Sequence, residues 1–195
     1  MAKTLSKKAW IWIIVALVII LVLLWGIGSY NRFVTLDQNI NGKWSEVNNQ
    51  YQRQADLIPN LVSVVSSSVS VETQFVKDVT AARTAWLNAQ TQFDKDKAGV
   101  GMFNGLSAFV ATAESYPALQ ANKQYVALTD ELAGTQNRIT VARGEYIRAI
   151  QTYNTAALRF PSRIIASMFG FEQKDYYQAE LNAMETPSLG TGELP

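Results

Sequence analysis

The apolar pattern of the chain begins with an uninterrupted stretch near the N-terminus. Residues 9–27 read AWIWIIVALVIILVLLWGI and contain no charged side chain. An α-helix rises 1.5 Å per residue, so about 20 such residues cross the roughly 30 Å hydrocarbon core of a bilayer. Indole rings favour the boundary between membrane and water, and Trp10, Trp12 and Trp25 stand near the two ends of the stretch. The pattern predicts a transmembrane helix over residues 9–29, anchored by these three side chains.

Basic residues are concentrated before this stretch. Lys3, Lys7 and Lys8 precede it, and only Arg32 and Lys43 follow closely. By the positive-inside rule, residues 1–8 are expected in the cytoplasm and the rest of the chain on the extracytoplasmic side of the cell (inner) membrane, with a single pass. The competing interpretation is a cleaved signal peptide, whose apolar region spans about 7–15 residues and ends at a small-residue site. The longer stretch favours a retained helix.

After residue 30 the apolar positions take the period of an amphipathic helix. Leu36, Ile40, Trp44, Val47 and Tyr51 are separated by steps of four, four, three and four, which places them on one helix face. No strong helix breaker lies between residues 27 and 56. The transmembrane helix is therefore expected to continue into the soluble part as one stiff rod.

Pro59 leaves the architecture open. Proline lacks an N–H group and clashes with the preceding turn, so a helix must kink or restart there. If the chain reverses, Asp56 is a candidate cap for a new helix, with Pro59 in its first turn. If it does not, one kinked helix runs through this position.

The following segments carry further helical stripes. Residues 62–71 taken alone look like a strand, but helical stripes on both sides favour a helix. Residues 94–105 (DKDKAGVGMFNG) are expected to form a loop because they contain three glycines, and a short helix is expected over 106–113. The apolar stripe that precedes this loop runs through these positions: Leu61, Val65, Phe75, Val79, Ala82, Trp86, Ala89 and Phe93.

The last long helix is expected from about Pro117 to Phe160, ending before Pro161. Its apolar stripe is regular over many turns, which is typical of a helix in a bundle. A short apolar segment follows, which either lies in a bilayer interface or covers one end of the bundle, the latter being favoured. Its apolar side chains are Ile164, Ile165, Met168, Phe169 and Phe171. Residues 178–195 are expected to be a disordered tail.

Composition excludes several functional classes. The net charge of +1 argues against a nucleic-acid surface. The chain contains neither cysteine nor histidine, so a thiol nucleophile, a lipid-modified cysteine and the commonest general base are missing. The start of the 94–105 segment resembles a calcium loop, but Ala98 and Gly105 stand where ligands are required. No catalytic activity, cofactor or metal is expected.

Several polar residues lie beside the apolar stripes. They can run along helix edges with their stems covering apolar surface, which is the favoured interpretation. Alternatively they form a structural polar network, with Arg53 and Asp56 fixing the helix register near Pro59. The residues of this expected network are Arg53, Asp56, Asn60, Arg83, Arg138 and Arg143.

Some of these residues belong to a recognisable pattern. The run DLIPNLV at 56–62 stands behind Arg53 and before Arg83, and NRITVARGEY occupies 137–146. Together with the later pairs Tyr-Asn at 153–154, Phe-Pro at 160–161 and Gly-Phe at 170–171, the pattern resembles the LemA family over about residues 30–177. The resemblance implies a mostly antiparallel, up-and-down helical bundle on a single membrane anchor, without established catalytic activity.

The expected fold class is therefore all-α: an N-terminal transmembrane helix followed by a helical bundle over residues 30–177. The expected function is a membrane-anchored scaffold or interaction protein that self-assembles in the membrane plane. Its expected partners are the lipid bilayer and either further copies or other membrane proteins. The alternative is a bundle that binds a ligand or lipid in an aromatic pocket lined by Trp44, Tyr51, Trp86, Tyr146 and Tyr153.

Overall fold

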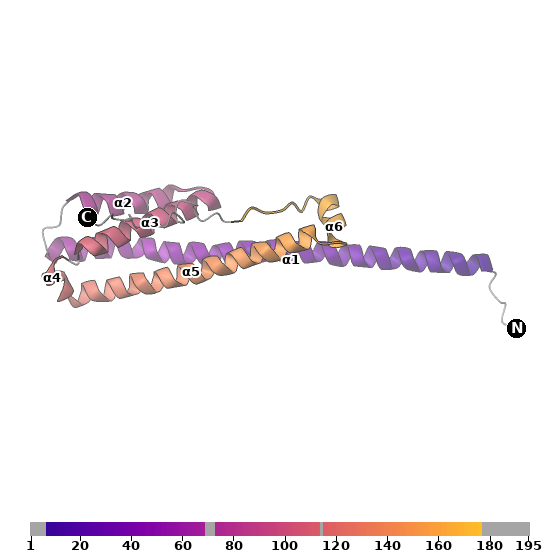
Figure 1. Ribbon diagram of the computed structural model, residues 1–195, viewed down its shortest axis with the longest axis horizontal. Coiled ribbons are helices and arrows are strands. Elements are labelled where there is room, and N and C mark those ends of the chain that lie inside the picture. The colour runs from indigo at the N-terminus through magenta and orange to yellow at the C-terminus, as the bar shows by residue number, and fades with distance from the viewer. Residues whose placement is uncertain (1–6, 69–72, 114, 177–195) are drawn as a thin grey trace, which may run out of the picture. The chain divides into compact units, whose positions relative to one another are not determined.

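The computed structural model describes residues 7–68, 73–113 and 115–176. The described residues contain no strand, which confirms the all-α fold class (Figure 1). The elements are α1 (Lys7–Ser68), α2 (Thr73–Asn88), α3 (Gln92–Ala113), α4 (Pro117–Gln120), α5 (Lys123–Leu158) and α6 (Ser162–Phe169). The chain divides into two compact units: unit 1 comprises residues 1–36 and 150–195, and unit 2 comprises residues 37–149.

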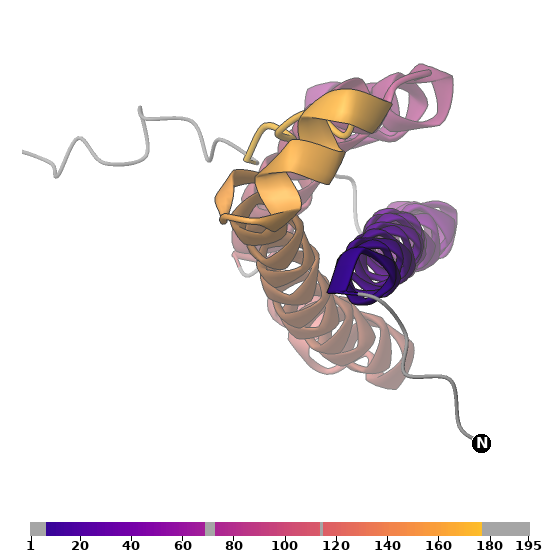
Figure 2. The same ribbon diagram turned by 90° about the vertical axis from the view of Figure 1, so that its right-hand side faces the viewer.

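Helix α1 has 62 residues and contains Pro59 within it. The chain therefore does not reverse at this proline, and Asp56 does not begin a new helix. Among the described residues, α1 is the one helix that is long and apolar enough to cross a membrane, as judged by its length and composition. Figure 2 looks nearly along α1 from its first residues. The region from 62 to 68 is helical, and residues 69–72 lie outside the described part.

Within unit 2, α1 and α5 run antiparallel. The Nζ of Lys43 lies 2.6 Å from the Oε2 of Glu145, and further along α1 the Nε2 of Gln54 lies 3.5 Å from the Oε1 of Gln136. As the residue numbers rise along α1, the residue numbers of their partners on α5 fall. The two helices therefore point in opposite directions.

Helices α2 and α3 complete an up-and-down arrangement in unit 2, and they lie side by side (Figure 1). Arg83 of α2 contacts Ala55 of α1, and the Trp86 ring lies 6.4 Å from the Tyr51 ring, so α2 runs antiparallel to α1. Buried side chains from α1 to α5 fill one core, among them Val47, Ile58, Leu61, Val65, Val79, Trp86, Met102, Leu106, Phe109, Leu119, Leu132 and Ile139.

The predicted loop at 94–105 is wrong, because these residues belong to helix α3. Thr91 caps this helix: its Oγ1 accepts a hydrogen bond from the Asp94 N–H at 3.0 Å and donates one to the Asp94 carboxylate at 2.7 Å. This is a reciprocal cap of the kind that starts helices. The buried Gly99 allows close packing, since a Cβ there would lie 2.5 Å from the Tyr51 ring.

Two other helix boundaries also differ from the sequence-based expectation. α2 ends at Asn88, and Phe93, which was expected on the same buried stripe, is exposed. α5 begins at Lys123, because the Oδ1 of Asn122 accepts the N–H groups of Gln124 at 2.9 Å and Tyr125 at 3.2 Å. Pro117 instead begins the short helix α4.

Unit 1 joins the first part of α1 to the end of α5, to α6 and to the segment after α6. The Phe33 ring stacks on the Phe171 ring at 4.9 Å and lies 5.9 Å from Tyr153. Helix α6 ends at Gly170, whose φ of 72° is left-handed and suits glycine. The side-chain amide of Asn154 then holds the following segment through two hydrogen bonds with the Lys174 backbone, at 2.7 and 2.9 Å.

Candidate functional site

Near Pro59, a backbone carbonyl of α1 accepts a hydrogen bond from a side chain of another helix. An α-helical carbonyl accepts from the N–H four residues later, but Pro59 has no N–H, so the Ala55 carbonyl lacks its usual donor. The Nε of Arg83 on α2 donates to this carbonyl oxygen at 2.8 Å. Ala55 is fully buried, and a buried carbonyl without a donor is costly. Arg83 therefore replaces the donor that Pro59 lacks and ties α2 to α1.

A second cluster surrounds the buried carboxylate of Asp96 on α3. Its Oδ1 accepts a hydrogen bond from the Tyr51 hydroxyl at 3.1 Å and lies 3.6 Å from the Nε of Arg143. Its Oδ2 is buried and accepts no hydrogen bond from the described residues. Burial raises the pKa of Asp96 to about 6, although the Arg143 charge and the Tyr51 hydroxyl lower it. Burial, followed by the Asp96 charge, raises the pKa of Tyr51 beyond its usual range.

A third cluster is centred on Glu131 of α5. Its Oε1 lies 2.6 Å from the Nη2 of Arg53 and 3.1 Å from the Nη2 of Arg138. Arg138 also donates to the Oε1 of Gln50 at 3.3 Å and to the hydroxyl of Thr135 at 2.9 Å. One carboxylate thus joins an arginine of α1 to an arginine of α5. All three charged side chains are partly exposed, so solvent weakens these attractions.

The other polar residues of the expected network lie apart from these clusters. Asp56 is exposed and accepts a hydrogen bond from the Nε2 of Gln52 on its own helix, at 2.9 Å. Asn60 is exposed. The partner of Arg53 is Glu131 rather than Asp56. The six expected residues are therefore distributed over separate contacts rather than gathered in one network.

Sequence reasoning missed Asp96, Glu131 and Gln54. Asp96 was assigned to a loop, and only the helical interpretation of 92–113 would have placed it on the same face as Met102 and Leu106. Gln54 is buried and its Oε1 accepts no hydrogen bond from the described residues. The sequence does contain a signal for Gln54. It lies three residues after Tyr51 and four before Ile58, which is the spacing of an apolar helix face, yet it carries a polar amide.

The predicted aromatic pocket is wrong. Tyr51, Trp86 and Tyr153 are buried, and the rings pack on others: Trp44 lies 5.5 Å from Tyr146, and Tyr51 lies 6.4 Å from Trp86. Trp44 and Tyr146 are half-buried, and none of the five rings lines the cavity described below.

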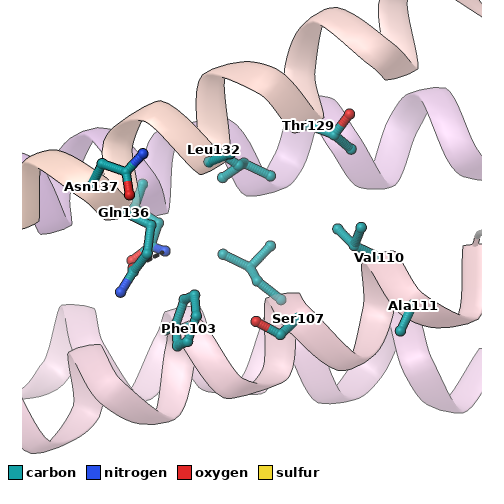
Figure 3. Close-up of a pocket in the computed structure, with 11 residues that line it drawn as sticks. Phe103, Ser107, Val110, Ala111, Thr129, Leu132, Gln136 and Asn137 are labelled. Carbon is teal, nitrogen blue, oxygen red and sulfur yellow. Dashed lines mark hydrogen bonds between the residues drawn. The ribbon is translucent and has the colours of Figure 1, made fainter. Parts of the chain in front are cut away.

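An open cavity of about 410 Å³ lies instead between α3 and α5 in unit 2 (Figure 3). Apolar side chains from both helices form most of its wall, and Gln54 of α1 lines it as well. The labelled lining residues in the close-up are Phe103, Ser107, Val110, Ala111, Thr129, Leu132, Gln136 and Asn137. The cavity is thus mainly apolar, with a few amide and hydroxyl groups.

The expected membrane-facing residues lie in unit 1. Trp10, Trp12 and Trp25 are exposed along the apolar part of α1. In the C-terminal segment the residues divide into two sets. Ile165 is buried and Phe171 is half-buried, whereas Ile164, Met168 and Phe169 are exposed.

These features define a class of protein: a membrane-associated helical bundle, with an apolar N-terminal helix that continues into the bundle and charged side chains that join its helices. The chain belongs to the LemA family, whose model matches residues 43–189. It is also similar to magnetosome proteins MamQ 1 and MamQ 2 of Paramagnetospirillum magneticum, at 26% identity over 82% of this chain and 68% of each relative. Magnetosome protein MamQ of Magnetospirillum gryphiswaldense is 24% identical over the same shares.

Proposed function

We propose that this protein is a membrane-anchored scaffold that self-associates in the plane of the membrane, with no catalytic role. The observation that carries the proposal is the continuity of α1, which passes from the apolar stretch into the wall of the unit 2 bundle without a break. Membrane anchoring confines copies to one plane and raises their effective concentration. The charged clusters fit a structural role without catalysis, because Arg83, Asp96 and Glu131 make contacts that join helices within the bundle.

Self-association is tested with the full chain in liposomes. Because the chain contains no cysteine, the exposed Asn104 can be changed to cysteine and labelled with donor or acceptor dye in two separate preparations. Energy transfer should exceed that of an unrelated single-span protein at the same protein-to-lipid ratio, and excess unlabelled chain should reduce it. Transfer equal to that of the unrelated protein would overturn self-association.

We further propose that residues 1–8 are cytoplasmic and that unit 2 lies on the extracytoplasmic side of the inner membrane, as the charge distribution favours. The Asn104→Cys chain should react with a membrane-impermeant maleimide in intact cells, whereas the matched Ser6→Cys chain should react only after lysis. The reverse pattern would overturn this orientation.

A second candidate function rests on the cavity between α3 and α5. The buried Oε1 of Gln54, which lines this cavity, lacks a hydrogen-bond donor among the described residues. The cavity would suit an elongated apolar molecule that carries one hydroxyl or amide donor, such as dodecanol. Dodecanol should raise the melting temperature of the full chain in detergent more than dodecane does, and Gln54→Leu should abolish that difference. Equal effects of the two probes would exclude this candidate.

A further inference from the structure

Helix α6 and the residues before it carry an apolar surface that unit 1 leaves uncovered. We call this set the outer face: Leu158, Phe160, Ile164 and Met168. Phe160 is 79% exposed and Met168 is 71% exposed. Ile164 and Met168 are one turn apart and therefore share one side of the helix. Several exposed apolar side chains within one short segment are typical of a surface that contacts a partner or a membrane.

The opposite side of α6 packs on α1 at a defined level. Ile165 and Ala166 are buried, and the Cδ1 of Ile165 lies 3.8 Å from the position that a Cβ on Gly26 would take. The Phe169 ring lies 5.1 Å from the Tyr30 ring. Helix α6 is thus held beside the part of α1 between Gly26 and Tyr30, within the same unit.

This level coincides with the end of the apolar stretch. Residues 9–27 span roughly 28 Å of helix at 1.5 Å per residue, which is about the thickness of the hydrocarbon core. The headgroup region adds about 5–8 Å on each side, and Gly26 to Tyr30 occupy about 6 Å of helix. If residues 9–27 cross the bilayer, α6 is therefore placed in the interfacial layer.

The charges beside the outer face also fit this layer. Arg159 and Arg163 flank the start of α6 and both are exposed, where long basic side chains can reach lipid phosphates. The acidic residues Glu172 and Asp175 follow only after Gly170 has ended the helix. The apolar surface thus has a basic border, Arg159 and Arg163, at the start of α6.

The geometry points to the bilayer interface as the occupant of the outer face, so that α6 makes a second contact with lipid beside the transmembrane helix. This inference rests on the proposed membrane insertion of residues 9–29. A second copy or another protein is the less economical occupant, because the level of α6 beside residues 26–30 already places the outer face at the interface.

The test measures the depth of single labels in liposomes that contain phosphatidylcholine and phosphatidylglycerol. The full chain receives one cysteine and an environment-sensitive fluorophore at Met168, at the neighbouring exposed Ser167 as a matched control, or at Leu17 inside the apolar stretch. Quenching is then measured with nitroxide placed in the upper acyl chain of the lipid and with iodide in the water. Circular dichroism confirms equal helix content of the three variants.

We expect the Met168 label to be quenched by the lipid nitroxide at least twice as strongly as the Ser167 label, and to be protected from iodide. Equal behaviour of the two labels would overturn the inference. So would protection of Met168 from both quenchers, because protein rather than lipid would then cover it. The Leu17 label separates the two proposals. Its protection from iodide supports membrane insertion even if the outer face does not contact lipid. Its exposure to iodide would overturn the proposed membrane insertion.

The basic border has its own readout. Arg163→Glu, or liposomes of phosphatidylcholine alone, should reduce the lipid quenching of the Met168 label, since either change removes the attraction between guanidinium and anionic headgroups. If neither does so, the charged part of the contact is overturned.

Discussion

In unit 2, ion pairs add to the ring contacts that join distant parts of the chain, whereas in unit 1 such parts are joined mainly by aromatic rings. Arg53 and Arg138 share Glu131, while Phe33 and Tyr30 pack against rings that follow α6 or end it. Charged contacts depend on pH and salt, but ring contacts retain their strength in apolar surroundings. The ring contacts of unit 1 therefore tolerate lipid, whereas the ion pairs of unit 2 are suited to water.

The largest effect should come from the close packing of α3 on α1 in unit 2. Gly99→Ala places a Cβ against the buried Tyr51 ring, which is also held by Asp96, so it should destabilise the protein by about 3 kcal/mol. Gly101→Ala is the matched control, because nothing lies within 4 Å of its Cβ, and it should stabilise the helix by about 0.5–1 kcal/mol. Thermal unfolding in detergent compares the two; equal effects would contradict the packing role of Gly99.

The next effect should come from the donor to the Ala55 carbonyl. Arg83→Met removes a charged hydrogen bond from a buried oxygen and should cost about 2 kcal/mol. Pro59→Ala restores the N–H that this carbonyl normally receives, so Arg83→Met should cost less in that background. A double-mutant cycle of unfolding free energies measures the coupling. Purely additive effects would show that Arg83 does not compensate for the proline.

Asp96 should make the stability of unit 2 depend on pH. Its pKa in the folded state, about 6, lies above the ordinary value of 3.8, so the folded state binds the proton more tightly. The resulting stabilisation is full below about pH 4 and is lost as the pH rises through about 6. Asp96→Asn should lack this component. Parallel pH curves for the two proteins would show that burial does not raise this pKa.

In unit 1, Phe171→Leu keeps an apolar side chain but removes the stacking on Phe33. It should cost about 1 kcal/mol, and this cost should be the same at about 0.1 M and about 1 M salt, since the contact is uncharged. Melting curves at the two ionic strengths provide the measurement. A cost that changes with salt would break the contrast between the units.

The smallest effect should come from Glu131→Gln in unit 2. The carboxylate and its two arginines are partly exposed, so losing the charge should cost about 0.5 kcal/mol. Unlike the previous substitution, this cost should shrink at about 1 M salt, where exposed charges are screened within a few ångströms. A salt-independent cost would indicate a structural role other than ion pairing.

The sequence predicted the helical class and the apolar stretch, because both depend on periodicity and length along one segment. It left Pro59 undecided because the compensating donor, Arg83, belongs to another helix. The 94–105 segment was misassigned for a related reason. Its glycines suggested turns, but Gly99 serves the approach of Tyr51, and such a need is visible only when α1 and α3 are placed together.

In the candidate site, too, the sequence indicated features within one segment but not contacts between helices. Arg53 and Arg83 could be singled out from their positions beside the apolar stripes. Their partners could not, since Glu131 and the Ala55 carbonyl are reached across helices. The start of α5 was misplaced because Pro117 suited a first turn, whereas the side chain that accepts the first N–H groups is that of Asn122.

Unit 1 is assembled from the two ends of the described chain, and this has a consequence for its biosynthesis. Phe33 leaves the ribosome well over a hundred residues before Phe171, the ring on which it stacks. At about 5–20 residues per second, translation separates them by roughly 7–28 s. The apolar stretch of α1 is available to the membrane throughout this interval. Insertion can therefore be completed before the aromatic contacts of unit 1 close, and α6 would be added to a helix already in place.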